Sequence, residues 1–372
     1  MAINYASKYS SLVDERFKEA SLTGAAVNND YDFDGVNTVN IYEVDTAPMN
    51  NYIASGSNRY GSTAELGNGT QTVVLNQDRS FTFTIDRKSE QDTMGVMQAG
   101  ASLRRQIDEV VIPERDMYNI AKMIGSAGYL DETALDKTNA YEKFLDARRN
   151  IRNNKVPING LIAFVSTNFY KLIKLDPAFI KACDIAQNML INGQVGKIDN
   201  IAIVEVPDAY LSGAEFVITH PVATSAPEKL VEYKTNDNAP GISGTLVEGR
   251  LRYETFVRKN KKGAIAVHMG KVDAVSAKTT MAGESTFTFA DIDADLIKRS
   301  GLDLYYKAGA AQAAIAVGTD CSNGYTKVNE VELNKGFTLS GLTNGQKIAF
   351  AFVDTNKKCV IPSKVITIVA QG

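Results

Sequence analysis

The sequence predicts an α+β protein in which a long helix follows an amphipathic strand and an all-β segment ends the chain. Phe81, Phe83 and Ile85 alternate with polar residues, which is the period of a half-buried strand. From Glu90 to Gly125 apolar residues recur at helical spacing, and Pro113 interrupts that stretch. Towards the C-terminus, short apolar runs separated by Gly and Asn turns indicate a β-sandwich.

Composition is that of an ordinary globular protein. The 372 residues are 44% hydrophobic and 22% charged, which allows a sizeable core. A net charge of −3 argues against a protein whose main role is to bind nucleic acid, because such proteins carry a basic excess. Charged residues in the first twenty positions argue against a signal peptide, and no apolar run has the length of a membrane span. We therefore expect synthesis in the cytosol.

The N-terminal region predicts an arm and a projecting hairpin. Residues 1–49 are polar, with a strand pattern around Val39 and Ile41. Residues 50–71 are rich in Asn, Ser, Gly and Thr, and so long a loop is uncommon inside a compact domain. Because it lies between two predicted strands, we interpret it as the tip of a hairpin that leaves the body.

Helices and strands are mixed from residue 129 onward. Helical spacing covers Tyr141–Ile151 and Thr167–Lys174, and the predicted strands are Leu161–Val165, Ile198–Val206 and Glu215–Thr219. Two further strands, Leu246–Val257 and Ala264–Met269, flank the basic turn at residues 258–263 and are predicted to form a hairpin.

A shift to Ala, Ser and Thr predicts a linker at residues 273–283, followed by a β-domain at 284–372. Its strands are expected at Leu302–Lys307, Ala314–Val317, Tyr325–Leu333, Phe337–Leu339, Ile348–Val353 and Val365–Val369. Because about 90 residues suit one sandwich, we expect an autonomous appendage, so that truncation after Lys271 still permits assembly.

No catalytic or metal-binding motif is present, so we predict a non-enzymatic protein without a cofactor. His220 and His268 have no catalytic partner at a suggestive spacing. Asp30–Gly35 matches the first half of a calcium loop, but Ile41 stands where the bidentate glutamate belongs. The alternating aspartates 291, 293 and 295 are better interpreted as a capped turn.

Two further groups of residues leave alternatives open. Cys183, Cys321 and Cys359 are too few for a disulfide framework; a Cys321–Cys359 bridge and buried free thiols are the two interpretations. Glu205 and Glu232 are loose candidates for the carboxylate pair of a hydrolase with a carbohydrate-binding β-module.

Basic residues cluster at two places in the body. The first group is Arg258, Lys259, Lys261 and Lys262, and the second is Arg148, Arg149, Arg152 and Lys155. Either group could contact the phosphates of nucleic acid. The alternative is a solvated turn and a helix end that favours cations.

The order of arm, projecting hairpin, kinked helix and mixed body resembles the major capsid proteins of tailed bacteriophages, the Hong Kong phage 97 fold. The stretches that carry this resemblance are Phe81–Asp86 with Arg104–Asp108, then Ala147–Pro157, Leu161–Val165 and Phe169–Leu172, and finally Gly196–Asp199 with Val204–Pro207. They are similar to the extended loop's returning strand, the spine helix and the axial domain. The resemblance covers residues 1–272.

The resemblance implies an N-terminal arm (1–49), an extended loop (50–86), a spine helix (87–128), a mainly axial domain (129–250) and a peripheral-domain hairpin (251–272). It implies a virion subunit that assembles in the bacterial cytoplasm into hexamers and pentamers around double-stranded DNA, with scaffold and portal proteins as partners. Subunit contacts are then expected from the loop residues Arg59, Tyr60, Glu65 and Arg79. An encapsulin-like compartment shell shares the fold and is the alternative.

Two departures from the family pattern matter. Some members crosslink through a lysine of the extended loop, but no lysine lies between Lys18 and Lys88. The C-terminal stretches Leu339–Gln346 and Pro362–Ile366 look like the end of a fibronectin type III or related immunoglobulin-like domain, with Ile348 where a tyrosine is usual. That resemblance implies an immunoglobulin-like sandwich on the outer surface of the head.

Overall fold

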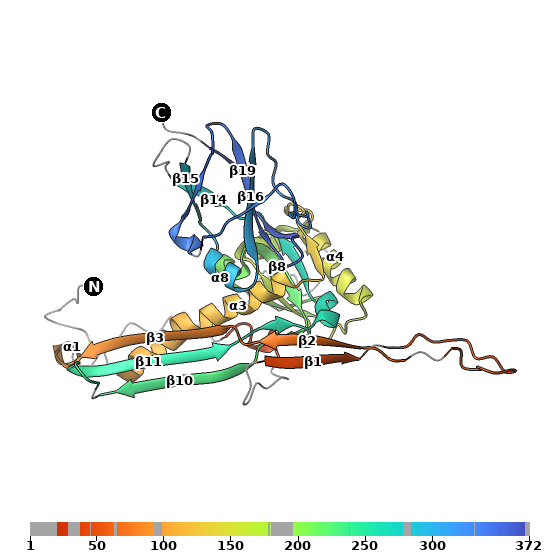
Figure 1. Ribbon diagram of the computed structural model, residues 1–372, viewed down its shortest axis with the longest axis horizontal. Helices are drawn as coiled ribbons and strands as arrows, with labels where there is room; N and C mark the ends of the chain where they lie inside the picture. Colours follow the sequence, from red (N-terminus) through yellow and green to blue (C-terminus); the bar gives the residue numbers. More distant parts are fainter. Residues whose placement is uncertain are drawn as a thin grey trace.

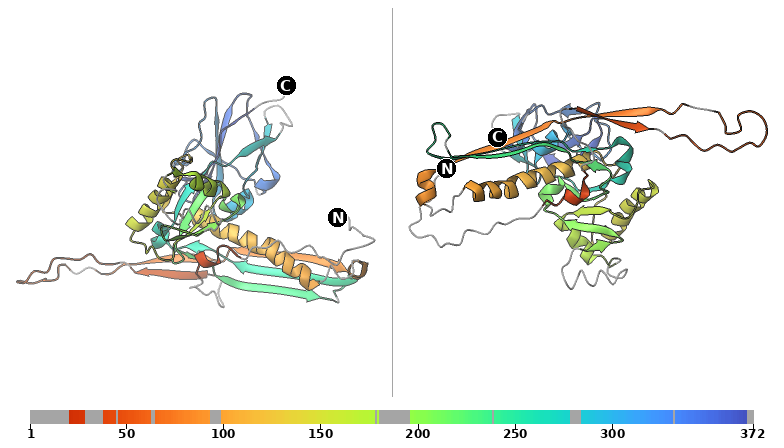
Figure 2. Two further views of the ribbon diagram at one scale, coloured as in Figure 1. Left: turned by 180° about the vertical axis from the view of Figure 1, so that it is seen from behind. Right: turned by 90° about the horizontal axis from the view of Figure 1, so that it is seen from below.

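The computed structural model describes residues 21–28, 38–44, 46–62, 65–92, 99–177, 179, 196–237, 239–277, 284–330 and 332–368. A flat base is formed by a hairpin and a long sheet that extend from the body in opposite directions (Figure 1). A mixed domain adjoins this base, and the C-terminal β segment stands on one side of it (Figures 1 and 2). Most of the predicted arm, including Asp30–Gly35, lies outside the described residues.

The projecting hairpin predicted from the sequence is confirmed. Strand β1 (Thr38–Val44) pairs antiparallel with β2 (Asn68–Val74) through the whole length of both strands. The connection between them reaches far from the body (Figure 2). Upstream, the short 3-10 helix η1 (Gly24–Ala26) places Ala26 in the core.

Strand β3 (Gln77–Asp86) pairs with β11 (Gly244–Tyr253), which pairs in turn with β10 (Glu228–Asn236). As the alternation predicts, Ile85 is buried and Phe81 is half-buried, whereas Thr82 is exposed. The spine helix lies along this sheet (Figure 1).

The spine helix begins after α1 (Arg87–Asp92) and consists of α2 (Ala99–Gln106), the π turn η2 (Ile107–Val111) and α3 (Ile112–Gly125). The predicted interruption at Pro113 takes the form of this π turn, in which the Ile112 amide donates to Ile107 O. A proline cannot donate to the carbonyl four residues earlier, so the preceding turn widens and the helix continues. From Ala99 to Gly125 the rod is about 40 Å long at about 1.5 Å per residue.

The mixed domain is built on a six-stranded sheet with the order β4-β13-β8-β5-β7-β6. Its strands are β4 (Tyr129–Asp131), β5 (Ile162–Val165), β6 (Lys197–Ile198), β7 (Ile201–Glu205), β8 (Ala214–Thr219) and β13 (Ala266–Met269). Helices α4 (Ala140–Asn153) and α5 (Thr167–Leu175) pack on it, and rings of Phe144, Phe169 and Phe216 meet between them. A 3-10 turn, η3 (Asp208–Leu211), precedes β8.

The predicted hairpin over residues 246–269 is wrong. Strand β11 pairs with β3 and β10, β12 (Phe256–Val257) pairs with β9 (Thr224–Ser225), and β13 pairs with β4 and β8. The basic turn between them is the 3-10 helix η4 (Lys259–Ala264), which crosses from one sheet to another. A strand pattern specifies the faces of a strand but not its partner. The segment 228–253, predicted mostly as axial, therefore belongs to the sheet beside the spine helix.

The C-terminal segment contains two antiparallel sheets, as predicted for a sandwich. One contains β14 (Ala274–Ala277), β15 (Glu284–Phe289) and β18 (Phe337–Ser340); the other contains β17 (Thr326–Lys327), β16 (Asp303–Gly309), β19 (Lys347–Val353) and β20 (Cys359–Pro362), with β21 (Ile366–Thr367) on β19. Phenylalanine rings join them: Phe287 and Phe350 have centroids 5.1 Å apart. Helix α8 (Ala294–Arg299) and turn η5 (Leu333–Lys335) complete the segment.

Several predictions for this segment need correction. The linker predicted at 273–283 contains strand β14, and residues 278–283 lie outside the described part. Ala314–Val317 forms no strand, and the strand predicted over Tyr325–Leu333 shrinks to β17. The small residues of β14 give no strong hydrophobic alternation in the sequence. The strand forms by antiparallel pairing with β15, which a local pattern does not reveal.

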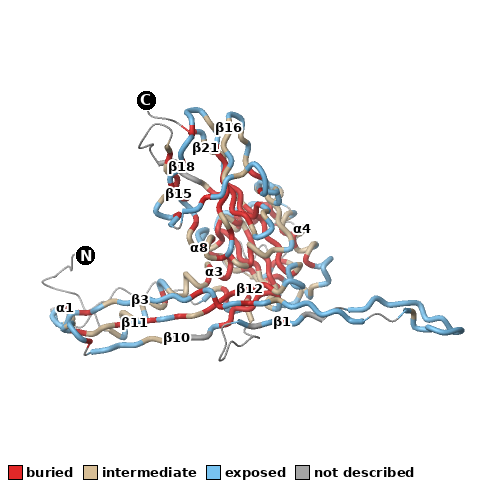
Figure 3. The backbone as a smooth tube through the Cα atoms, viewed as in Figure 1, coloured by how far each residue is buried: buried red, intermediate tan, exposed pale blue. Residues whose placement is uncertain are grey.

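The expectation of an autonomous appendage stays a prediction, and one hydrophobic cluster that runs through both parts argues against it (Figure 3). It contains Ile120 and Ile124 of the spine helix together with Phe287 and Leu302 of the C-terminal segment. A side chain at Gly125 would touch Leu302 at 3.4 Å. A domain that folds alone needs its own core. This segment has a small cluster of its own around Tyr305 and Cys359, but its larger cluster is shared with the body.

Candidate assembly surfaces

The hairpin displays large apolar side chains that the chain itself does not cover. Met49 is 99% exposed, Tyr60 83% and Tyr42 69%, and Tyr52 and Ile53 are also exposed. Figure 3 shows the hairpin almost entirely exposed. Contiguous exposed apolar residues mark interaction surfaces in soluble proteins. The hairpin is therefore the leading candidate for a protein-binding element.

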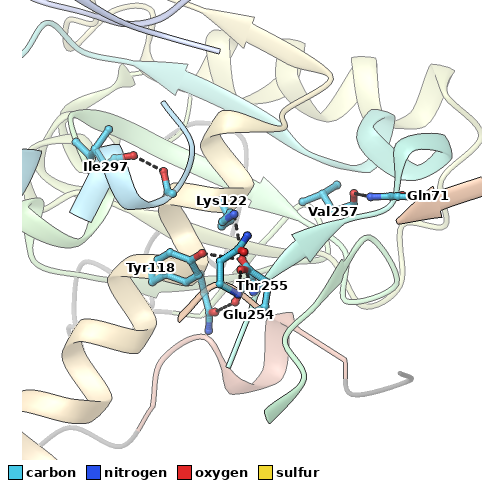
Figure 4. A network of polar contacts seen from close by, with 10 residues as sticks. Gln71, Tyr118, Lys122, Glu254, Thr255, Val257 and Ile297 are labelled. Carbon is cyan, nitrogen blue, oxygen red and sulfur yellow. Dashed lines mark hydrogen bonds and ion pairs between the residues drawn. The ribbon is translucent and has the colours of Figure 1, made fainter. Parts of the chain in front are cut away.

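The base of the hairpin, in contrast, is tied firmly to the body. Ile41, Val73 and Leu75 form a small buried cluster with Phe256. The Gln71 amide bridges the corner between β12 and η4: its Nε2 donates to Val257 O at 3.1 Å, and its Oε1 accepts from the Lys259 amide at 3.1 Å (Figure 4). The exposed tip is thus held in a defined direction.

The structure places three of the four predicted contact residues in the hairpin. Arg59 and Tyr60 lie at the tip, where the Tyr60 and Tyr52 rings meet edge-on with centroids 5.1 Å apart. Glu65 is exposed just before β2. Arg79 is separate from them, since it lies on β3 and its Nε pairs with Glu114 Oε1 of the spine helix at 2.8 Å.

A buried polar network joins the hairpin base, the spine helix and the two residues that follow strand β11 (Figure 4). Glu254, 2% exposed, accepts from Tyr118 Oη at 2.6 Å and pairs with Lys122 Nζ at 3.0 Å. It also accepts from the backbone amides of Asn76 and Thr255, both at 3.1 Å. No local sequence pattern singles out Glu254, because only the fold brings its partners together.

The network extends to the N-terminal segment through Asp116, which is 2% exposed. Its carboxylate accepts from Ser21 Oγ at 2.8 Å, from the Leu22 amide at 2.7 Å and from Thr23 Oγ1 at 2.5 Å. Asn119 Nδ2 donates to Thr23 Oγ1 at 2.8 Å. Residues 21–23 are thereby fastened across the spine helix.

The two basic groups predicted separately lie next to each other. Asn154 Nδ2, at the end of α4, donates to Gly263 O of η4 at 3.2 Å. A cavity of about 420 Å³ lies between these elements, and both Lys155 and Lys261 line it. Lys259 and Lys262 are exposed beside it, whereas Arg258 is half-buried. The spacing of the two basic groups along the sequence did not predict that they lie together.

The catalytic candidates do not form an active site. Glu205 lies on β7 and Glu232 on β10, which belong to different sheets. His220 Nδ1 accepts from the Val222 amide at 3.2 Å, so its Nε2 is left to donate to Asn159 O at 3.1 Å. Asp293 caps α8 by accepting from the Leu296 amide, which confirms the capped turn.

In the described ranges, no cluster of three or more His, Cys, Asp or Glu side chains could hold a metal ion. None of the helices described is both long and apolar enough to cross a bilayer. Cys321 and Cys359 are buried free thiols, and burial raises the pKa of each.

His268 predicts a pH dependence of stability. It is 2% exposed on β13, and burial lowers its pKa below the ordinary value despite the nearby Asp131 and Glu215 carboxylates. Below about pH 6.5 the His268 side chain takes up a proton more readily in the unfolded chain than in the folded chain. The free energy of unfolding therefore falls as pH drops. We expect His268→Gln to flatten this fall in urea titrations between pH 7.5 and 5.5. Parallel curves for both proteins contradict the assignment.

Comparisons with known proteins bear on the fold. No protein-family model and no curated protein sequence matches this chain. Solved structures match it well. A chain from Mycobacterium phage Che8 aligns with a TM-score of 0.59 at 16% identity, covering 72% of this chain and 98% of that one. A chain from the asymmetric unit of the bacteriophage PhiM1 mature capsid has a TM-score of 0.54 at 12% identity, covering 72% and 92%.

A third match is a chain from the capsid structure of the Cyanophage P-SCSP1u, with a TM-score of 0.57 at 10% identity, covering 72% of this chain and 93% of that one. The chain has the fold of phage capsid proteins. This confirms the predicted α+β capsid fold. More than a quarter of the chain falls outside each alignment, so the immunoglobulin-like assignment of the C-terminal segment stays a prediction.

Proposed function

We propose that this chain is the major capsid subunit of a tailed bacteriophage, which assembles into hexamers and pentamers of an icosahedral head around double-stranded DNA. The observation that carries the proposal is the hairpin, which exposes Met49, Tyr52 and Tyr60 on a capsid fold. Burying large apolar side chains stabilises an interface by about 25 cal/mol per Å². Such a hairpin is useful only when it lies on a neighbouring subunit.

The proposal predicts that deletion of Ser55–Gly69 leaves a folded chain that does not assemble. The described residues of this segment are almost all exposed, so its loss removes no core contact. Light scattering coupled to size exclusion, with negative-stain images, distinguishes shells and capsomers from a monomer of about 40 kDa. Circular dichroism and thermal unfolding verify that the shortened chain folds. Normal shells from the deleted chain contradict the proposed role.

We further propose that the exposed lysines of η4 face the packaged DNA. Lys259, Lys261 and Lys262 extend the basic surface formed with α4. Replacing all three with alanine is expected to weaken binding to short duplex DNA and to reduce the slope of log K against log salt by up to about 2.7. The matched control replaces three exposed lysines of the C-terminal segment with alanine: Lys335, Lys347 and Lys358. An unchanged salt slope in the triple variant contradicts this orientation.

The C-terminal segment fits a position on the outer surface of the head. It stands on one side of the flat base that the hairpin and the β3-β11-β10 sheet form (Figures 1 and 2). If the subunits of a shell meet at the edges of their bases, a segment that stands on one side of the base does not clash with the neighbouring subunits. We propose that this is the outer side of the head. Antibody labelling of intact heads tests this placement.

A further inference from the structure

The cavity of about 420 Å³ between α4 and η4 is walled by three segments that are far apart in the sequence. They are the end of α4, the turn that follows β8, and η4. Lys155 and Lys261 line the cavity from two of these segments, and Asn260 joins them. Gly263 lets the walls approach closely, since a Cβ there would meet the Asn154 side chain at 2.9 Å. The cavity is therefore a feature of the fold rather than of any one loop.

The positive charge of this cavity is not compensated by its surroundings. No Asp or Glu occurs in the segments that supply its walls, which are residues 147–175, 216–227 and 255–272. Across the part of the chain that the structure describes, no carboxylate pairs with Lys155 or Lys261. Two unpaired cations around a hollow create a potential that attracts an anion.

Lys155 is held in a backbone conformation that lysine rarely adopts. Its φ is +62°, in the left-handed region, just beyond the end of α4. The Lys155 amide donates to Arg152 O at 2.9 Å, and the Val156 amide donates to Ile151 O at 3.4 Å. This is the Schellman pattern of helix ends, which favours glycine at the position of Lys155. A side chain there costs stability, and such costs are typical of functional sites.

The remaining walls of the cavity supply shape rather than charge. Both ring nitrogens of His220 are engaged, Nδ1 with the Val222 amide and Nε2 with Asn159 O, so the imidazole forms a wall. Val222, which is 45% exposed, and the half-buried Val156 add an apolar lining. The cavity thus combines cations with apolar side chains. A sugar phosphate has the matching composition, since its anion is attached to a less polar ring.

We propose that this cavity binds a phosphate group together with its sugar, as they occur along the backbone of the packaged DNA. The identity of the ligand rests on the proposed function, which supplies the DNA. Lysine side chains donate charge-assisted hydrogen bonds to phosphate oxygens. The site adds Lys155 to the DNA-binding residues, and it distinguishes Lys261, which lines the cavity, from Lys262, which is exposed beside it.

The first test compares two lysines of the same turn. Binding of a short labelled DNA duplex to the full chain is measured by fluorescence anisotropy at low salt for Lys261→Ala and Lys262→Ala. We expect the loss of a charge-assisted hydrogen bond in Lys261→Ala to weaken binding about tenfold, and the loss of an exposed charge in Lys262→Ala to weaken it less than about threefold. Equal weakening by the two substitutions indicates a diffuse basic surface and overturns the cavity as a site.

The second test uses the backbone conformation of Lys155. Glycine adopts the left-handed region without strain, so Lys155→Gly is expected to raise the midpoint of thermal unfolding while it weakens DNA binding about tenfold. Lys357→Gly is the matched control, because Lys357 of the C-terminal segment has the same φ of +62°. We expect this control to leave DNA binding unchanged. Unchanged binding in Lys155→Gly, or a fall in both stability and binding, contradicts the proposed role of Lys155.

The third test identifies the source of the phosphate. Deoxyribose phosphate and inorganic phosphate compete with the labelled duplex at equal ionic strength. Because the apolar lining covers the sugar, we expect the sugar phosphate to displace the duplex at a concentration about fivefold lower. Equal displacement by the two compounds indicates a site for free phosphate and overturns the sugar contact. Failure of both compounds to displace the duplex overturns the site.

Failure of this site is distinguishable from failure of the proposed function. Full DNA affinity in both Lys261→Ala and Lys155→Gly overturns the cavity and leaves the capsid proposal intact. Normal shells from the chain without Ser55–Gly69 contradict the capsid proposal itself.

Discussion

Truncation after Lys271 is expected to unfold the body. The cut removes Phe287, Leu302 and Phe350 from a cluster that also contains Ile120 and Ile124 of the spine helix. Each of these side chains is at most 3% exposed in the intact chain. The truncated chain would expose the spine helix along the face that the C-terminal segment covers, and burying each such side chain is worth about 1.5–3 kcal/mol.

A single substitution measures the same coupling without removing a segment. Leu302 lies over Gly125 at the end of the spine helix, so Leu302→Ala leaves a cavity between the two parts of the core. We expect a loss of about 2–5 kcal/mol in the free energy of unfolding, measured by denaturant titration. Leu302→Met conserves volume and is expected to cost less than about 1.5 kcal/mol.

The number of transitions decides between the two interpretations. If the segment and the body share one core, Leu302→Ala shifts a single cooperative transition seen by all probes. Two separate unfolding transitions, of which Leu302→Ala shifts only one, would show that the C-terminal segment folds on its own. A soluble and folded chain 1–271 would lead to the same conclusion.

Glu254→Ala is expected to be the most destabilising single substitution at the hairpin junction. The carboxylate is 2% exposed and binds Lys122 and Tyr118 together with two backbone amides. Removing one partner of a buried ion pair costs about 3–5 kcal/mol, because the other charge stays desolvated. The Lys122 side chain is 20% exposed and can reach some water, so we expect about 3 kcal/mol.

Two controls separate charge from packing at this site. Glu254→Gln keeps the shape and an acceptor for Tyr118 Oη but sets an amide against the Asn76 amide, so we expect an intermediate loss. Glu332→Gln removes an exposed pair with Lys335 and is expected to leave stability almost unchanged, because water screens such a pair. Equal losses in the free energy of unfolding at Glu254 and Glu332 would mean that the buried network stabilises the hairpin junction no more than an exposed ion pair does.

The Glu254 variant also has a consequence for assembly. Glu254 accepts from the amide of Asn76, which lies between β2 and β3, so losing it loosens the base of the hairpin. Hydrogen exchange is expected to increase in β2 while it stays slow in the six-stranded sheet. The structure thus links the stability of the core to the direction of the hairpin.

Local patterns along the chain were sufficient for the elements that have strong periodicity. The alternation at Phe81–Ile85 specified β3, helical spacing specified α4 and α5, and the Asn- and Gly-rich run specified the hairpin tip. These features depend on neighbours within a few residues, and the burial of one face enforces them. The capsid-like order of elements followed from the same patterns.

Local patterns do not predict which residues distant in sequence lie together. No local pattern states that β11 pairs with β3, that Glu254 meets Lys122, or that η4 lies beside α4. Only the tertiary structure decided that the C-terminal segment shares a core with the spine helix, since apolar residues will pack on any complementary face that the fold brings near. The groove lined by Val110 of η2 and Asn334 of η5 exists only because these two parts pack together. Hydrophobic burial is non-directional, so the topology of the chain determines which surfaces meet.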